Sequence, residues 1–365
     1  MWQGTDFPTW VRLLATRPPL CWKQSLRLAV VTALSMNNSV MGLTERLLFG
    51  RKVRNTELIG EPVFIVGHWR SGTTLLHNLL SMDPQFATPN LYQVLNPHHF
   101  LVTESLVTRL TARFLPNTRP MDNMEVSWDS PQEDETALMN MTLLSPYLMV
   151  AYQGNRPKYE RYFDLRDLSE KELQRWKDAL LLLMKKLTLK EKKTILLKSP
   201  THSYRVRTLL EMFPRAKFIN IVRNPYAVYN STLHLRRTLF TENALGPVNF
   251  HNLEEDTFLT YEHLFRVFEE DRPLIPKGQL HDLKFEDLEV DPVGELRKIY
   301  EQLNMQGFDD LEPKVTAQLE SLRKYRKNEF TMEEGLMRRI YDRWGAAFER
   351  YGYPSGLSNT SAQVA

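Results

Sequence analysis

An apolar strand that runs straight into a glycine-bearing loop and a helix leaves few folds open to this chain. Residues 62–66 (PVFIV) form a continuous run rich in β-branched side chains, as buried parallel strands do. Residues 67–74 (GHWRSGTT) follow at once, and residues 75–80 have helical spacing. Gly67 and Gly72 stand five residues apart. That is the glycine spacing of a phosphate-binding loop, which directs backbone N–H groups at an anion beside a helix N-terminus.

Further strands and helices alternate along the chain. Apolar runs at residues 194–198 and 217–223 are typical of strands, a later strand is expected at 279–285, and segments with helical spacing separate them. Ser169 and Glu172 form a capping box ahead of a long helix, which we expect to end near residue 189. This alternation predicts an α/β fold with a P-loop-like parallel sheet flanked by helices and a helical N-terminal extension.

The 365 residues divide into three predicted regions. Residues 1–55 form the helical extension, 56–354 one α/β domain, and 355–365 a flexible polar tail. The apolar stretch 26–36 is too short to span a bilayer, which takes about 20 apolar residues. We expect the extension to pack on the core. Contact of residues 1–50 with a membrane surface, or an apolar substrate entrance, is the alternative.

Charge and cysteine content limit the expected classes of binding partner and the expected location of the protein. The net charge is +3, and no block of Lys and Arg interleaved with aromatic residues appears. A nucleic-acid partner is therefore not expected, whereas mild basicity suits a small anionic ligand. The single cysteine, Cys21, cannot form an internal disulfide, which favours a cytoplasmic location with membrane association as an addition.

The loop departs from the pattern of nucleotide hydrolases. A standard P-loop places Lys directly after its second glycine, whereas here Thr73 follows Gly72 and the cation is Arg70. No apolar strand ends in an Asp suited to magnesium, and no cluster of metal ligands is evident. A P-loop kinase or hydrolase stays as an alternative that these features disfavour.

Three motifs together resemble those of sulfotransferases that use 3′-phosphoadenosine-5′-phosphosulfate (PAPS), particularly the branch with the tyrosylprotein sulfotransferases. Residues 70–74 (RSGTT) are similar to the 5′-phosphosulfate loop of that family. Residues 222–225 (VRNP), with Ser231 in the next helix, resemble its 3′-phosphate motif. Residues 197–200 (LKSP) resemble its Lys-x-Pro step. The order and the strand–helix context agree over roughly residues 61–235.

The resemblance implies two anion sites for PAPS. The 5′-phosphosulfate would contact Arg70, Ser71, Gly72, Thr73 and Thr74. The 3′-phosphate would contact Arg223 and Ser231, with Arg326 and Lys327 of a cationic run over it. Arg70 and Lys198 would stabilise negative charge on the leaving oxygen, and no metal is required.

The base that accepts the acceptor's proton stays open. The tyrosylprotein branch carries Glu 21 residues after the loop arginine, where this chain has Leu91. Glu133 or Glu135 of the acidic cluster, His202 and His68 are the candidates. Loss of the usual Glu also keeps a non-catalytic PAPS-binding relative as an alternative.

The resemblance predicts transfer of a sulfuryl group from PAPS to an acceptor hydroxyl or amine, with 3′,5′-ADP as the other product. Residues 92–152 and the N-terminal extension are the segments expected to shape the acceptor pocket. Their Met and aromatic content favours a small-molecule or lipid-like acceptor, and a peptide is the alternative.

Overall fold

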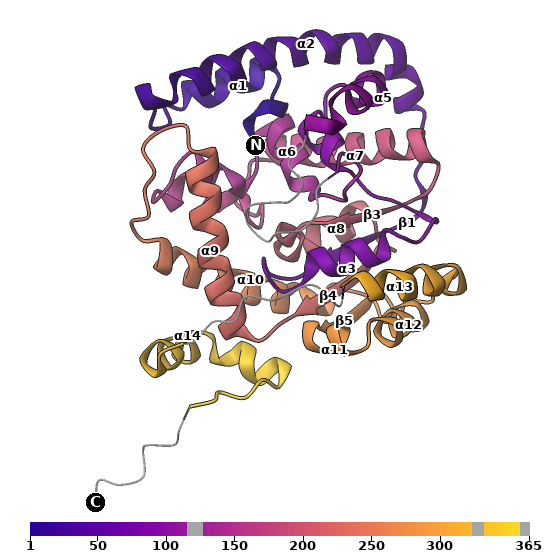
Figure 1. Ribbon diagram of the computed structural model, residues 1–365, viewed down its shortest axis with the longest axis vertical. Helices are drawn as coiled ribbons and strands as arrows, with labels where there is room; N and C mark the ends of the chain where they lie inside the picture. Colours follow the sequence, from indigo (N-terminus) through magenta and orange to yellow (C-terminus); the bar gives the residue numbers. More distant parts are fainter. Residues whose placement is uncertain (115–126, 323–331, 358–365) are drawn as a thin grey trace, which may run out of the picture.

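A five-stranded parallel sheet lies at the centre of the computed structural model, which describes residues 1–114, 127–322 and 332–357 (Figure 1). Within these residues the strand order is β2-β3-β1-β4-β5. The strands are β1 (Ile59–Val66), β2 (Phe86–Ala87), β3 (Thr194–Lys198), β4 (Lys217–Val222) and β5 (Leu280–Lys284). The predicted α/β fold, with helices flanking a parallel sheet, is confirmed.

Helices cover both faces of the sheet because alternate residues of a strand point to opposite sides. Phe64 and Val66 of β1 pack in one apolar cluster with α7 (Glu170–Glu191) and α8 (Val206–Met212). Val63 and Ile65 pack in a second cluster on the other face. That cluster includes residues of α3 (Thr73–Leu80), α12 (Pro292–Gln302) and α13 (Phe308–Leu322).

A third apolar cluster joins the ends of the chain. It includes residues of α9 (Pro225–Asn243), α10 (Leu253–Asp271) and α14 (Glu334–Tyr351), together with residues near the N-terminus. The Tyr261 ring of α10 stacks on Trp344 of α14 with a centroid distance of 4.0 Å. The capping box of Ser169 and Glu172 is present at the start of α7. The other α-helices are α4 (Leu91–Leu95), α5 (Phe100–Thr111), α6 (Asp134–Thr142) and α11 (Phe285–Val290).

The N-terminal segment forms two helices along one edge of the molecule (Figure 1). These are α1 (Phe7–Ala15) and α2 (Ser25–Arg54), and Trp10 and Leu13 of α1 are buried in the third cluster. The apolar stretch 26–36 belongs to α2. Farther along α2, the Asn38 side chain donates to the carbonyl oxygens of Gln3 and Thr5, which ties this helix to the N-terminal residues. Among the described residues, no helix is both long and apolar enough to cross a bilayer.

Candidate active site

The three sequence motifs meet at one edge of the sheet. β1, β3 and β4 run parallel, and β1 lies between the other two. Their carboxyl ends lead into the loop 67–72, Lys198 and Arg223 respectively. In open α/β sheets this edge binds ligands where the connections diverge from neighbouring strands.

The loop needs glycine at both predicted positions. Gly72 has φ +99°, and a Cβ there would lie 2.2 Å from Cδ2 of Phe285. Gly67 has φ +140°, and its Cβ would lie 2.3 Å from the carbonyl oxygen of Ile221. Arg70 also adopts the left-handed region, with φ +69°. This conformation costs a non-glycine residue about 1–2 kcal/mol, so the surrounding contacts must hold the loop in shape.

Those contacts join the two predicted anion sites. The Nε of Arg70 donates to the Ser231 hydroxyl over 2.7 Å. Nη1 of Arg223 donates to the Arg70 carbonyl over 3.2 Å, and its guanidinium lies 4.3 Å from the centre of the Phe285 ring. Two cationic side chains therefore converge on the loop although they lie 153 residues apart in sequence. Converging guanidinium groups suit phosphate and sulfate oxygens.

The other loop residues shape the backbone. Ser71 is buried, and its hydroxyl donates to the His68 carbonyl over 2.8 Å. Thr73 and Thr74 open α3, where first-turn amides lack intrahelical acceptors and the helix dipole favours an anion. Arg326 and Lys327 lie outside the described residues.

Glu133 connects the loop to Lys198. The Lys198 ammonium donates to Oε1 of Glu133 over 2.7 Å, and the Tyr147 hydroxyl donates to Oε2. The Trp69 indole N–H donates to the Tyr147 hydroxyl over 3.2 Å. Burial, followed by the charge of Glu133, raises the pKa of Tyr147 well above its ordinary value, so Tyr147 stays a neutral donor. The Glu133 side chain is 23% exposed, which leaves it accessible to an acceptor.

Glu135 and His202, two other base candidates, are enclosed in structural pairs. Glu135 accepts from Nη1 of Arg205 over 2.6 Å and from the Thr201 hydroxyl over 2.8 Å. Nε2 of His202 lies 2.8 Å from Oδ2 of Asp134, and all these side chains are fully buried. Burial opposes ionisation of Asp134, but His202 and Ser199 hold its pKa below the ordinary value. These pairs fix the start of α6 against residues 199–205, which follow β3, and offer no access to an acceptor.

His68, the last candidate, is a buried residue of the loop itself. Its Nδ1 lies 2.7 Å from the Trp69 carbonyl oxygen, and its ring lies 5.0 Å from Tyr261. Burial lowers the pKa of His68 to about 3, so the ring is neutral and a weak base. Among the four candidates, Glu133 is the one that combines exposure with contact to Lys198.

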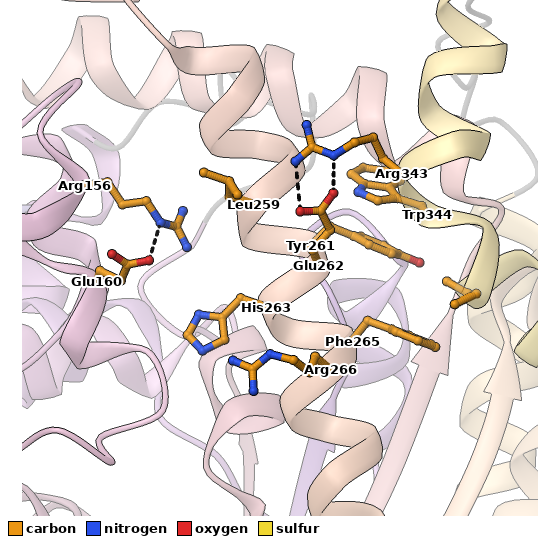
Figure 2. Close-up of a pocket in the computed structure, with 12 residues that line it drawn as sticks. Arg156, Glu160, Leu259, Tyr261, Glu262, His263, Phe265, Arg266, Arg343 and Trp344 are labelled. Carbon is orange, nitrogen blue, oxygen red and sulfur yellow. Dashed lines mark hydrogen bonds and ion pairs between the residues drawn. The ribbon is translucent and has the colours of Figure 1, made fainter.

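An open groove of about 460 Å³ lies away from this site, between α10 and α14, as Figure 2 shows. Tyr261 separates it from the loop, since this ring contacts His68 on one side and Trp344 on the other. Charged side chains of the groove pair with each other, as Arg343 does with Glu262. We therefore assign the site to the loop edge and not to the groove.

The sequence motifs did not point to Tyr147 or Trp69. Trp69 lies inside the loop, and its large ring between two glycines is a signal that could have identified it. Tyr147 belongs to a short 3₁₀ helix, residues 146–150, that Ser145 caps by accepting from the Tyr147 amide. That local pattern signals a helix start but nothing about a site.

Comparison with known proteins identifies the protein family to which the chain belongs. A profile of the Sulfotransferase family matches residues 62–310, a span that contains the loop, Lys198, Arg223 and Ser231. The match covers more than half of the chain, and the chain therefore belongs to the sulfotransferase family. The protein is accordingly an enzyme of the transferase class, and the predicted family is confirmed.

Individual members of the family are similar to this chain over most of its length. The chain is 40% identical to the omega-hydroxy-beta-dihydromenaquinone-9 sulfotransferases Stf3 of Mycobacterium bovis and Mycobacterium tuberculosis, over 97% of this chain and 91% of each relative. Its fold matches the crystal structure of sulfotransferase STF9 from Mycobacterium avium with a TM-score of 0.69 at 18% identity, covering 91% of this chain and 86% of that one. The structure of STF1 from Mycobacterium tuberculosis matches with a TM-score of 0.60 at 16% identity, covering 94% of both chains.

Proposed function

We propose that this enzyme moves a sulfuryl group from PAPS to the terminal hydroxyl of a menaquinone-type lipid. The observation that carries the proposal is the contact of Arg70 with Ser231 and of Arg223 with the Arg70 carbonyl. The Trp69–Tyr147–Glu133–Lys198 chain of hydrogen bonds continues from the same loop. Cations for a donor with two anionic ends therefore adjoin a carboxylate, Glu133.

PAPS would supply the transferable sulfuryl group, and the chain offers groups for both of its anionic ends. The amides at the start of α3, the hydroxyls of Thr73 and Thr74, and Arg70 would bind the 5′-phosphosulfate. Arg223 and Ser231 would bind the 3′-phosphate. Arg326 and Lys327 stay part of the proposal as further cations over that phosphate.

Two residues would accept the proton of the acceptor and stabilise the charge on the leaving group. The acceptor oxygen forms a bond to sulfur while the bond from sulfur to the bridging oxygen breaks, and that electron pair leaves with 3′,5′-ADP. Glu133 takes the proton of the acceptor hydroxyl, because it is the accessible carboxylate of the acidic cluster. Lys198, at the end of β3, stabilises negative charge on the leaving oxygen.

The surroundings of Glu133 suit an apolar acceptor. Trp69 and Tyr147 belong to the same apolar cluster as Trp10 and Val31 of the N-terminal helices. The 40% identical relatives are named for sulfation of an omega-hydroxylated menaquinone, a lipid with a hydroxyl. A lipid hydroxyl is therefore the acceptor that we favour over an amine or a peptide.

Two measurements test the proposal. Calorimetric titration should show tighter binding of 3′,5′-ADP than of ADP or ATP, with and without magnesium. Mass spectrometry should then detect a sulfated product when PAPS is supplied with omega-hydroxylated menaquinone, and none with the unhydroxylated lipid.

The two measurements test the donor assignment and the acceptor assignment separately. Preference for ATP with magnesium would overturn the donor assignment. Binding of 3′,5′-ADP without sulfation of the hydroxylated lipid would instead overturn the acceptor assignment and leave the donor site standing.

A further inference from the structure

Helix α2 is apolar on the side that faces away from the protein. We call this the outer face and define it by Leu26, Val30, Val40, Leu47 and Leu48 of α2 with Trp22 just before it. These side chains are between 47% and 80% exposed. Val40 and the Leu47–Leu48 pair lie about four and six helical turns beyond Leu26, so the set follows one side of the helix.

The side of α2 that faces the protein carries buried polar residues in addition to Val31 and Val53. Asn38 donates to two backbone carbonyls near the N-terminus, and its Oδ1 lies 3.1 Å from Nε2 of His99. Glu45 is buried against the Lys186 ammonium at 2.5 Å and accepts from the Leu101 amide at 2.7 Å. A helix on the surface of a water-soluble protein shows the opposite arrangement, with its apolar stripe toward the core. The outer face thus has the chemistry of a surface that meets an apolar phase.

Basic side chains flank this apolar row. Arg17 and Lys23 are exposed near one end, and Arg51, Lys52 and Arg54 near the other. Residues 1–54 hold eight Lys and Arg against two acidic residues, and one of those acids, Glu45, is buried on Lys186. The charge that this segment presents outward is therefore strongly positive and complements anionic lipid headgroups.

We infer that the outer face docks in the plane of an anionic membrane surface. A helix of 30 residues is about 45 Å long, and it would lie flat with its apolar side chains at the headgroup boundary. A second copy of the chain fits less well, since a symmetric pair of α2 helices would bring basic ends together. Val31, on the inner side of α2, packs in one cluster with Trp69 of the loop, which connects the docking face to the site.

Vesicle sedimentation tests this inference directly. The wild-type protein should partition onto phosphatidylcholine vesicles that contain phosphatidylglycerol more than onto phosphatidylcholine alone, with a blue shift of tryptophan fluorescence. The triple variant Trp22→Glu, Leu26→Glu and Leu47→Glu should lose roughly tenfold or more in partitioning, because three apolar anchors become anions. The matched control is Val290→Glu, a change at an 86% exposed valine of α11, which should leave partitioning unchanged.

Several results would overturn the inference. The inference is wrong if the wild-type protein does not bind anionic vesicles. It is also wrong if the triple variant binds them as strongly as the wild type does. A wild-type dimer that the triple variant converts to a monomer would assign the face to a second copy. Thermal unfolding and 3′,5′-ADP binding check that the variant is folded, and Lys23→Glu with Arg51→Glu is a milder second variant. Because the assay uses no substrate, failure here leaves the proposed reaction untouched.

Discussion

Arg70 combines a costly backbone conformation with two contacts that hold it. Its side chain donates to Ser231, and its carbonyl accepts from Arg223. These contacts hold the loop in its shape without a ligand, so binding of the proposed anion would require less ordering. Ser231 contributes by fixing the direction of the Arg70 guanidinium.

Replacing Ser231 by Ala should weaken binding of 3′,5′-ADP about tenfold. The reason is that one hydrogen bond to a charged group is lost, which is worth about 1.5 kcal/mol. Isothermal titration calorimetry measures the change. Thr238→Ala is the control, because Thr238 lies farther along the same helix and its hydroxyl donates to the backbone carbonyl of His234 over 3.1 Å. Equal affinities for both variants and the wild type would contradict the assigned role of Ser231.

Replacing Glu133 by Gln should lower kcat by about 10²–10⁴-fold, since the amide keeps the shape but takes no proton. The dissociation constant of 3′,5′-ADP should stay near that of the wild type. Single-turnover kinetics with PAPS and an acceptor would separate this effect from product release. A variant within a few-fold of wild-type kcat would move the base elsewhere.

The neighbouring Glu135 should respond in another way. Glu135→Gln leaves the buried Arg205 without its counter-charge, which typically costs about 3–5 kcal/mol of unfolding free energy. Urea unfolding should show that loss for Glu135→Gln and a smaller loss for Glu133→Gln, because Lys198 is buried but its partner Glu133 is 23% exposed. The opposite result, with the larger loss of stability in Glu133→Gln, would assign the structural role to Glu133 and the role of base to Glu135.

At the scale of elements, α11 closes on the loop so tightly that its first residue excludes a side chain at Gly72. Gly72→Ala should therefore lower the unfolding temperature and weaken 3′,5′-ADP binding, because its Cβ would meet Phe285 at 2.2 Å in a left-handed conformation. Differential scanning calorimetry with a titration checks both effects.

Gly345→Ala is the matched control for that substitution. Gly345 lies inside α14, and an alanine Cβ there would have no neighbouring atom within 4 Å, so alanine should stabilise the helix by about 0.5–1 kcal/mol. If both alanines behaved alike, the close approach of α11 to the loop would not be what sets the loop's shape.

The elements near the site differ in how far the sequence predicts them. β3 has the bounds that its apolar run predicts, and Ser231 lies in the helix that follows the 222–225 motif, as expected. Helix α10 was not predicted from the sequence, although Phe258, Tyr261 and Phe268 have helical spacing. Which carboxylate of residues 133–135 faces the site could not be predicted. That depends on where α6 begins: Glu133 precedes the helix in an extended conformation, whereas Asp134 and Glu135 point inward from its first turn.

On the scale of the whole molecule, several buried histidines make stability depend on pH. Burial lowers the pKa of His68 to about 3 and of His99 to about 4, and that of His77 well below its ordinary value. In the unfolded chain these groups take up a proton below about pH 6.5, whereas the folded protein keeps them neutral. The folded state therefore loses stability as the pH falls from about 6.5 toward about 4.

Urea unfolding at about pH 7.5 and about pH 5.5 should show a loss of roughly 1 kcal/mol from each of His68 and His99 at the lower pH. The variant His68→Gln should have a shallower dependence, because its side chain does not titrate. Stability that is flat over this range, or that rises as the pH falls, would contradict burial of these rings in the neutral form.

Docking of the outer face of α2 on a membrane, as we propose, would also change which concentration governs turnover. An enzyme held flat on a membrane meets a lipid acceptor by diffusion in two dimensions, so its rate follows the mole fraction of acceptor in the lipid. Added inert lipid, with total acceptor held constant, would then dilute the acceptor and slow the reaction even though nothing changes per volume of solution. Cells could regulate such an enzyme through lipid composition alone.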